Sequence, residues 1–415
     1  MSELMKLKPI LLTLVLALIY LGVYGWNLHF PMRMYFDELY QASTAQQLLG
    51  GKMTYLTVHP PFGIMLMSLS ILIFDGVSWS WRVLSLFSGL GCLVLTYQIL
   101  KKLTHNSTTA ALSVILLGMD GLFFTQARIG MLNAPALFLM LSAIRCFIQV
   151  EPLKSWDREK ALVLSGLLLG LALSTKWLAA LTALFLALLI SSAKNDRDTN
   201  RVKEVLLYMI LLPAAVYLVV FLYFPYFYHL EWKGLDWSWI TKFQQSSTEH
   251  HLSLGPQHFF GSQWWTWPLM TRPVLYYSFQ TPNKLSCILC IGNPAIFWAI
   301  PLGIGTLLWD WWKNKSWVSG FVALGFFTHW LPWMFVSRYK FLHYFYPAMP
   351  FVAMALAIGL EKLWRKGPAG KGLTLIYLAV VTGLFVYWYP LLNGTAVSRE
   401  YYNHHMWLSS WKVLR

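Results

Sequence analysis

Acidic residues are scarce in this 415-residue chain, which has 17 Asp and Glu against 32 Lys and Arg, and charged residues of either sign make up only 12% of it. Cysteine is scarcer. The four cysteines include a lone C-x-x-C pair, Cys287 and Cys290, which without a second pair is a poor zinc site. With 57% apolar residues and a mean hydropathy of +0.52, the composition excludes a soluble globular protein.

Long apolar runs recur along the chain at the length that crosses a bilayer, roughly 17 to 25 residues. Backbone amides in hydrocarbon need internal partners, and the runs lack the alternation of barrel strands, so they are predicted to be helices. The fold class is therefore all-α and polytopic, with about 11 spans. We place them at residues 9–26, 82–100, 107–126, 133–150, 161–175, 177–193, 204–226, 288–311, 317–335, 346–363 and 372–390.

Basic residues cluster in short connections on one side of these spans, for example at Lys101 and Lys102 and at Lys362, Arg365 and Lys366. By the positive-inside tendency that side is cytoplasmic. The net charge of +15 then reports membrane topology, and no nucleic-acid partner is implied.

The opposite, outer side carries the long polar segments of a single membrane-embedded domain, residues 1–415. They are the first outer loop, residues 27–81, the second outer loop, residues 227–287, and the outer tail, residues 391–415. All are rich in aromatic residues, as expected of elements in the headgroup region. The apolar stretch 61–74 is too short for a span and suits an interfacial or re-entrant helix.

An adjacent acidic pair, Asp37 and Glu38, lies just beyond the first span. Because residues 41–49 read as helix, one interpretation is a solvated pair or an N-cap at its start. The other interpretation is that the pair takes part in a reaction at the membrane surface, on a substrate anchored in the lipid. His59 precedes Pro60 and Pro61 in the same loop, which makes either a rigid turn or a rigidly aimed imidazole.

Several cations break the positive-inside pattern at the outer face. Singly, each reads as a snorkelling or helix-capping residue. Together, cations from four hairpins beside an acidic pair suggest a pocket for an anion at the bilayer surface, and the expected anion is a lipid phosphate. The cations of this predicted pocket are Arg82, Arg128, Lys176, Arg338, Lys340 and His343.

These motifs, in this order, resemble the protein O-mannosyltransferase family of GT-C-fold membrane glycosyltransferases, and the resemblance covers nearly the whole chain. It is carried by residues 36–38 (FDE), 58–63 (VHPPFG), Arg82, 126–128 (QAR), 174–177 (STKW), 264–268 (WWTWP), 292–294 (GNP), 338–344 (RYKFLHY) and 406–411 (MWLSSW).

The resemblance implies transfer of mannose from a polyprenyl-phosphate mannose to Ser or Thr hydroxyls of secreted or membrane proteins, on the outer face. Asp37 is then the general base, and Glu38 positions donor or acceptor. Cations in place before the reaction meet the charge that grows on the leaving phosphate. The expected donor-binding residues are Arg82, Arg128, Lys176, Arg338, Lys340 and His343, and the expected substrate-positioning residues are His59, Gln245, His250 and Trp265.

One base without an enzyme nucleophile predicts inversion, from a β-linked donor to an α-linked product. No metal is predicted and no cofactor is required, although histidines of the outer loops, with carboxylates, offer possible ligands for a divalent ion. These are His59, His250, His251 and His258.

The chain departs from larger family members in two ways. Asn133 stands where the resemblance would put an acid, five residues after Arg128, and the second outer loop has no room for the β-trefoil module of eukaryotic members. The compact form predicts a bacterial inner-membrane protein with an extracytoplasmic active site. The oligomeric state stays open.

Two alternatives remain. A related GT-C enzyme would move another sugar, such as aminoarabinose, from polyprenyl phosphate to a lipid or glycan. A transporter or flippase would instead place ionisable residues near the midplane and show broken inverted repeats, whereas here these residues gather at one face.

Overall fold

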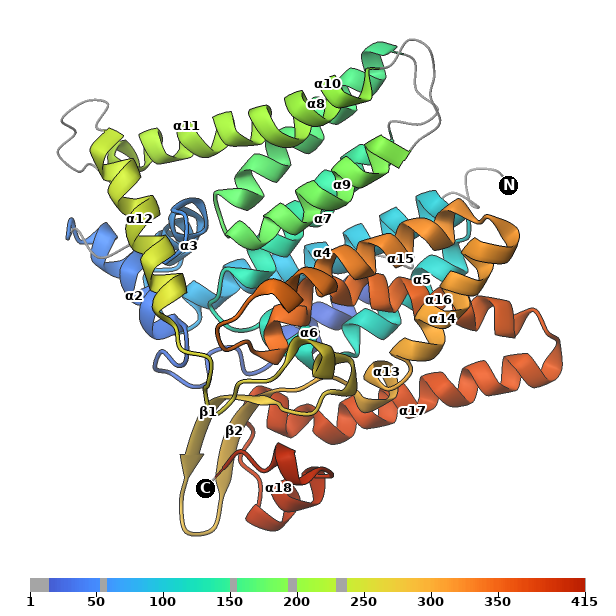
Figure 1. Cartoon of the computed structure of the whole chain (residues 1–415). Coiled ribbons are helices and arrows are strands. Elements are labelled where there is room, and N and C mark those ends of the chain that lie inside the picture. The colour runs from blue at the N-terminus through green and yellow to red at the C-terminus, as the bar shows by residue number, and fades with distance from the viewer. Residues whose placement is uncertain (1–14, 53–57, 150–154, 193–199, 229–236, 415) are drawn as a thin grey trace. The chain divides into compact units, whose positions relative to one another are not determined.

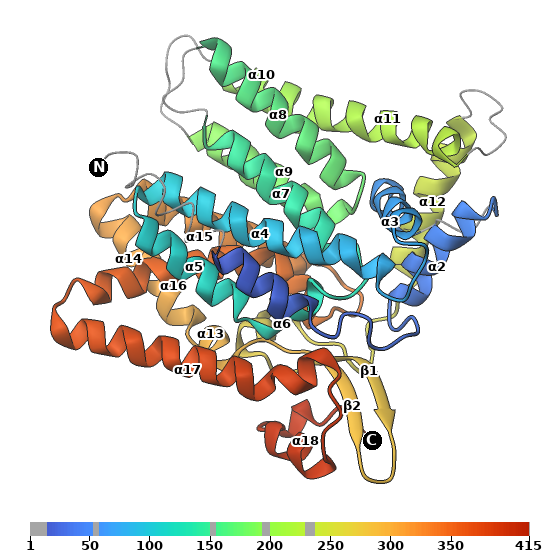
Figure 2. The ribbon, with the colours of Figure 1, turned by 180° about the vertical axis from the view of Figure 1, so that it is seen from behind.

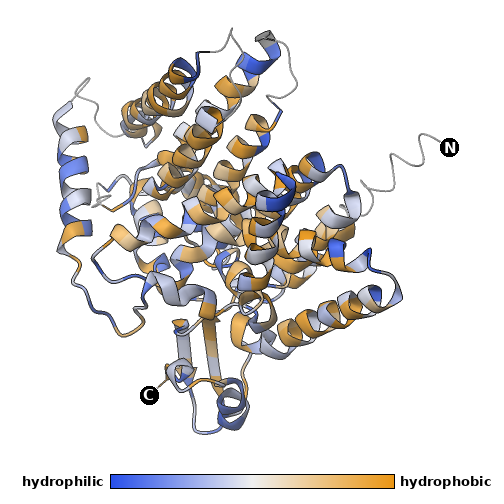
Figure 3. Cartoon of the chain, turned by 45° about the vertical axis from the view of Figure 1, so that its right-hand side comes forward, coloured by the Kyte–Doolittle hydropathy of each residue, from blue (hydrophilic) through white to orange (hydrophobic). Residues whose placement is uncertain are grey.

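The computed structural model describes residues 15–52, 58–149, 155–192, 200–228 and 237–414. Within these ranges the chain is mostly helical, and Figure 3 shows that the helical ribbon is predominantly apolar. This confirms the polytopic helical class. It also corrects the all-α prediction in one respect, because the described residues include a two-stranded sheet.

Five helices of the described residues are long and apolar enough to cross a membrane: Ser80–Thr104, Arg201–Phe227, Trp317–Phe335, Leu342–Trp364 and Pro368–Asn393. Five shorter apolar helices accompany them: Val15–Gly25, Phe62–Ile73, Ser107–Gly118, Asn133–Phe147 and Trp177–Ser192. The total of eleven spans stays a prediction. The start of the first expected span, residues 9–14, lies outside the described residues.

The chain forms two compact units, each made of discontinuous segments. Unit 1 comprises residues 1–36, 89–128 and 257–415, and unit 2 comprises residues 37–88 and 129–256. The helix α4 (Ser80–Thr104) contributes to both.

Unit 1 is built around α16 (Met349–Trp364), in which eleven of the 16 residues are buried. It packs against α5 (Ser107–Gly118), α14 (Ile300–Asn314), α15 (Trp317–Trp330) and α17 (Pro368–Asn393), and Figure 2 shows α5 beside it. The expected span 107–126 is broken between α5 and α6 (Gly121–Gln126). The break comes at Asp120, the N-cap of α6, whose carboxylate accepts a hydrogen bond of 2.8 Å from the Phe123 amide.

The strands β1 (Val274–Gln280) and β2 (Leu285–Cys290) form an antiparallel hairpin in unit 1 (Figure 1). The predicted span 288–311 was therefore wrong at its start. Residues 285–290 are fully buried in protein, against α6 and α17, so their apolar run belongs to a core strand. The helix α14 begins only at Ile300, after the short α13 (Pro294–Phe297).

Unit 2 contains α7 (Asn133–Phe147), α8 (Ser155–Leu173), the turn η1 (Trp177–Ala179) with α9 (Ala180–Ser192), and α11 (Leu212–Phe227). The short α10 (Arg201–Glu204) and the π-helical segment η2 (Val205–Leu211) lead into α11. The helix α8 packs against both α7 and α11, and Figure 1 shows α8 alongside α11.

The outer loops hold short elements. The first contains α2 (Glu38–Leu49) and α3 (Phe62–Ile73), which confirms the two short helices predicted there. The second contains α12 (Trp237–Ser253), η3 (Trp264–Leu269) and β1, and its residues 229–236 lie outside the described ranges. The outer tail contains α18 (Arg399–His405) and η6 (Ser409–Trp411).

Two glycines let α8 approach its neighbours closely. A Cβ at Gly166 would lie 2.6 Å from the Tyr208 carbonyl oxygen, and one at Gly170 would lie 2.5 Å from Val216 Cβ. The pair has the small-xxx-small spacing of close helix packing.

We therefore expect Gly166→Ala to lower the stability of the protein by about 1–3 kcal/mol, because a backbone oxygen cannot rotate away from the new methyl group. The measurement is the midpoint of thermal unfolding in detergent. Gly305→Ala in α14 is the control, since nothing lies within 4 Å of its added Cβ. Equal midpoints for the two variants would contradict the close approach.

Candidate active site

The acidic pair begins α2, and its two members have different surroundings. Phe36, just before them, has φ of +50°, a left-handed conformation that is uncommon for an aromatic residue. Asp37 occupies the N-cap position, yet its side chain makes no capping hydrogen bond. Residues that follow one another on a helix point about 100° apart, so Asp37 and Glu38 face different neighbours.

Glu38 is fully buried in an ion pair with Arg82, which is 1% exposed. Arg82 Nε donates to Oε1 at 2.8 Å and Nη2 donates to Oε2 at 2.9 Å. Trp81 Nε1 and the Gly130 amide donate to the same carboxylate at 3.0 and 2.8 Å. The carboxylate is thus satisfied by four hydrogen bonds, and the arrangement is structural. Contact of either residue with substrate stays a prediction.

Asp37 is partly exposed, and its carboxylate accepts no hydrogen bond from the described residues. Protein packed around the carboxyl raises its pKa above the usual range, and the positive charge of Lys176 opposes this by lowering it. Lys176 Nζ in turn donates to Asn133 Oδ1 at 2.5 Å. Asn133 is neutral, so this bond orients the ammonium without cancelling its charge.

The His59 segment is tied to two other parts of unit 2. The Phe62 amide donates to the Ser174 carbonyl at 2.9 Å, and Ser247 Oγ of α12 donates to the Val58 carbonyl at 3.1 Å. The His59 ring lies 6.0 Å from the His251 ring, centroid to centroid. Asp37, Lys176 and His59 thus belong to one unit.

Aromatic rings of α12 and η1 lie near the same segment. The His251 ring lies 5.8 Å from the Trp177 ring and 5.7 Å from the His250 ring. Gln245 is exposed and donates to Glu249 at 2.8 Å along its own helix. Trp265 belongs to unit 1, where it is 57% exposed. The positioning roles of His59, Gln245, His250 and Trp265 stay predictions.

Arg128 caps the helix Val15–Gly25. Its Nη1 donates to the carbonyl oxygens of Tyr24 and, at 2.7 Å, of Trp26, and its Nη2 donates to that of Asn27 at 3.1 Å. The guanidinium also lies 5.0 Å from the centroid of the Phe124 ring. A cation at the last carbonyls of a helix completes their hydrogen bonding and complements the helix dipole. These contacts give Arg128 a capping role, and its binding of a donor phosphate stays a prediction.

The segment 338–343 supplies the other predicted donor contacts, all in unit 1. Lys340 is buried and donates to the Val336 carbonyl. Burial lowers the pKa of its ammonium, and the charge of Arg338 lowers it further. The Arg338 guanidinium lies 5.5 Å from the Tyr344 ring centroid. His343 is buried, and its ring lies 5.3 Å from the stacked Phe341 ring.

Sequence reasoning missed the partners that fix the pair. Trp81 and Gly130 hold Glu38, and Asn133, noted only as a departure, holds Lys176. The one signal in the sequence for these partners is that Trp81 directly precedes Arg82. Over the described part of the chain, no group of three or more His, Cys, Asp or Glu side chains is placed to hold a metal ion.

Comparison of the sequence with known proteins identifies the family. A model described as "Dolichyl-phosphate-mannose-protein mannosyltransferase" matches residues 71–233, and one described as "C-terminal four TMM region of protein-O-mannosyltransferase" matches residues 236–411. A polyprenol-phosphate-mannose–protein mannosyltransferase of Mycobacterium tuberculosis is 26% identical, over 91% of this chain and 86% of that protein. The one from Mycolicibacterium smegmatis is 25% identical, over 91% and 87%.

Solved structures share the fold. The Saccharomyces cerevisiae Pmt1–Pmt2 complex bound to the sugar donor superposes with a TM-score of 0.85 at 16% identity, over 97% of this chain and 92% of that one. ArnT from Cupriavidus metallidurans, bound to undecaprenyl phosphate, gives 0.58 at 17% identity, over 92% and 64%. The fold is that of the GT-C membrane glycosyltransferases. With both family models matched over most of its length, the chain belongs to the protein O-mannosyltransferase family.

Proposed function

We propose that this enzyme transfers mannose from a polyprenyl-phosphate mannose to Ser or Thr hydroxyls of secreted or membrane proteins. Family membership and the mycobacterial relatives support the donor and the class of acceptor. The observation that carries the proposal is the contrast within the acidic pair. Glu38 is engaged in a buried ion pair, whereas the Asp37 carboxylate accepts no hydrogen bond from the described residues, which supports Asp37 as the general base.

The reaction is a direct displacement. The acceptor hydroxyl oxygen bonds to the anomeric carbon as Asp37 takes its proton, and the bond from that carbon to the phosphate oxygen breaks. The electron pair leaves on the lipid phosphate. Attack from the face opposite to the leaving group inverts the configuration, so a β-linked donor gives an α-linked product.

The leaving phosphate gains charge, which preorganised cations stabilise. We assign this role in unit 2 to Lys176, whose ammonium is oriented by its hydrogen bond to Asn133. The other predicted donor contacts stay predictions, and two of them, Arg82 and Arg128, also hold the scaffold. They are Arg82, Arg128, Arg338, Lys340 and His343. With fixed cations in this role, we propose that transfer requires no metal or other cofactor.

We also propose the outer face of a bacterial inner membrane as the place of reaction, where a lipid-linked donor and an exported polypeptide meet. Helices long and apolar enough to span support a multi-pass membrane protein. The oligomeric state is left open.

The direct test incubates the purified full chain with radiolabelled polyprenyl-phosphate mannose and a Ser/Thr-rich peptide. We expect label on Ser or Thr of the peptide. Label found only on added lipid or glycan would overturn the proposal in favour of a GT-C enzyme with a different acceptor. Absence of label on every acceptor, from intact donor, would contradict it as well.

The acid limb of the pH profile tests the coupling of Asn133, Lys176 and Asp37. Burial raises the pKa of Asp37, so the base is lost by protonation as pH falls through that raised value. The other charges at this end of α2, Glu38 and Arg82, neutralise each other. Asn133→Asp would pair with Lys176 and weaken its opposing effect. We expect the acid limb of kcat/KM to move to higher pH, as it should also in Lys176→Met. An unmoved limb in both variants would contradict the coupling.

A further inference from the structure

The hairpin of unit 1 has one closed edge and one open edge. On the far side of β2, Leu285 exchanges two backbone hydrogen bonds of 2.8 Å with Val397 of the outer tail. That edge is occupied. In the described part of the chain the sheet has only two strands, so the opposite edge of β1 is unpaired. Figure 1 shows the hairpin projecting from the helices of unit 1 with its turn at the free end.

The hydrogen-bonding pattern shows which groups point outward from this edge. Leu285 pairs with Gln280, and because its amide and carbonyl face Val397, this is a non-hydrogen-bonded pair of the antiparallel ladder. The N–H and C=O of Gln280 therefore also point away from β2. By the same alternation those of Ser278 do too, since Ser278 pairs with Cys287 two residues further along.

These groups are accessible and have no partner among the described residues. Ser278, Phe279 and Gln280 are exposed. The backbone amides and carbonyls of Ser278 and Gln280 form no hydrogen bond to any other described segment. They present two donors and two acceptors with a repeat of about 7 Å, twice the rise of a strand residue.

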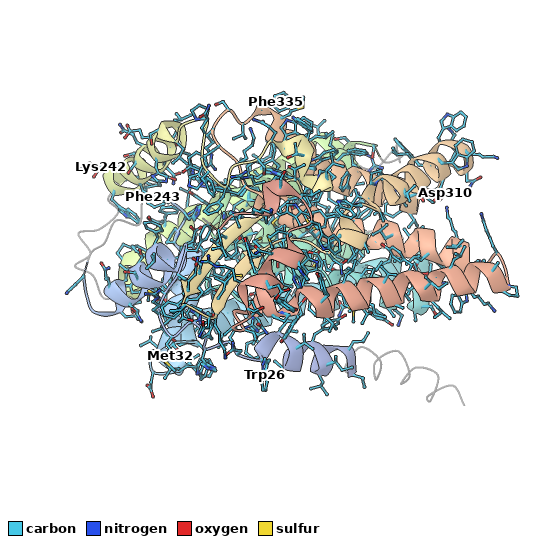
Figure 4. All side chains as sticks on the ribbon, turned by 90° about the horizontal axis from the view of Figure 1, so that it is seen from below. Trp26, Met32, Lys242, Phe243, Asp310 and Phe335 are labelled. Carbon is cyan, nitrogen blue, oxygen red and sulfur yellow. The ribbon has the colours of Figure 1, made fainter. Side chains whose placement is uncertain are left out.

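A cleft of about 400 Å³ adjoins the same strand. Its lining is His29, Phe30, Pro31, Met32, Arg33 and Tyr277. The Phe30 ring lies edge-on to the Tyr277 ring at 5.6 Å, and the Arg33 guanidinium lies 5.6 Å from the Tyr277 centroid. Met32 is 76% exposed, and Figure 4 shows its side chain pointing outward. The cleft offers apolar, aromatic and cationic contacts to side chains that leave a strand paired with β1.

We propose that the acceptor polypeptide binds as an extended strand along the open edge of β1, with side chains of one face toward this cleft. The inference rests on the proposed function, which requires a polypeptide substrate. Donors and acceptors repeating at two-residue spacing match an extended backbone, and neither a sugar nor a lipid tail presents that pattern. Main-chain pairing places few demands on the side chains of the acceptor. The edge therefore selects an acceptor segment by its extended conformation and not by its sequence.

The experiment uses the wild-type protein and a set of acceptor peptides, each N-methylated at one successive backbone position. An N-methyl group removes one N–H and blocks pairing on that side. Strand addition predicts a period of two: KM for the peptide rises about five- to tenfold at alternate positions on one side of the target Ser or Thr and stays unchanged between them. A flat profile, or one without alternation, overturns the proposal.

A variant tests the same edge from the side of the protein. Ser278→Pro removes an outward N–H, and we expect KM for the peptide to rise about tenfold with KM for the lipid donor and kcat unchanged. Asn283→Ala, at the exposed turn of the same hairpin, is the control. If Ser278→Pro changes the oligomer size but leaves the peptide KM unaltered, the edge pairs with a second copy of this chain, and the proposal is wrong.

The two failures are separable. No transfer to the unmodified peptide refutes the proposed function, and strand addition with it. Transfer without the period-two profile refutes strand addition alone.

Discussion

Asp37→Asn should lower the rate of mannosyl transfer by about 10²–10⁴-fold, because the amide cannot take the proton of the acceptor hydroxyl. The fold should be unaffected, since the carboxylate accepts no hydrogen bond from the described residues that the substitution would break. The measurement is kcat with saturating donor and peptide, together with the midpoint of thermal unfolding.

Asp75→Asn provides the matched control, because Asp75 is an exposed acid of the same outer loop. Its φ of +50° is a conformation that Asn also adopts. Full activity in Asp37→Asn would remove the carboxylate from the mechanism. Equal losses in the two variants would show that any acid of this loop has the same effect.

The second large effect concerns stability. Arg82→Met leaves the Glu38 carboxylate buried without its cation, and breaking such a pair costs about 3–5 kcal/mol. We expect a lower midpoint of thermal unfolding. Combining it with Glu38→Gln should recover part of the loss, because the buried charge is then gone.

This prediction separates the two roles considered for Arg82. If the guanidinium instead binds the donor phosphate, as the sequence suggested, Arg82→Met will leave the midpoint unchanged and raise KM for the lipid donor. The buried, bidentate pairing with Glu38 predicts the opposite order of effects.

Much of the fold could be predicted because hydrocarbon imposes helices on long apolar runs. The same rule failed at residues 288–290. A short apolar run buried on both faces by protein is indistinguishable in sequence from the start of a span, and here residues 285–290 form a strand under α6 and α17. The break at Asp120 had a signal, an acid inside the run at 107–126 that caps a new helix.

For the site, the sequence was enough to predict candidate residues, but not which partners each of them contacts. Asp37, Lys176 and His59 lie in one unit, but the partners of the cations depend on tertiary packing. Nothing local in the sequence says that Arg82 pairs with the neighbour of the base, or that Arg128 reaches the carbonyls of a helix a hundred residues earlier. Clustered positive charges therefore predicted an anion site, but the sequence could not show that two of these cations, Arg82 and Arg128, also hold structural contacts.

The configuration of the product tests the central claim most directly, namely that a single carboxylate activates the hydroxyl for direct displacement. Mannosylated peptide made from a β-linked donor would be analysed by NMR and by linkage-specific mannosidases. The proposed mechanism predicts an α-linked mannose on Ser or Thr. A β-linked product would mean two displacements through an enzyme nucleophile, and would contradict the role given to Asp37.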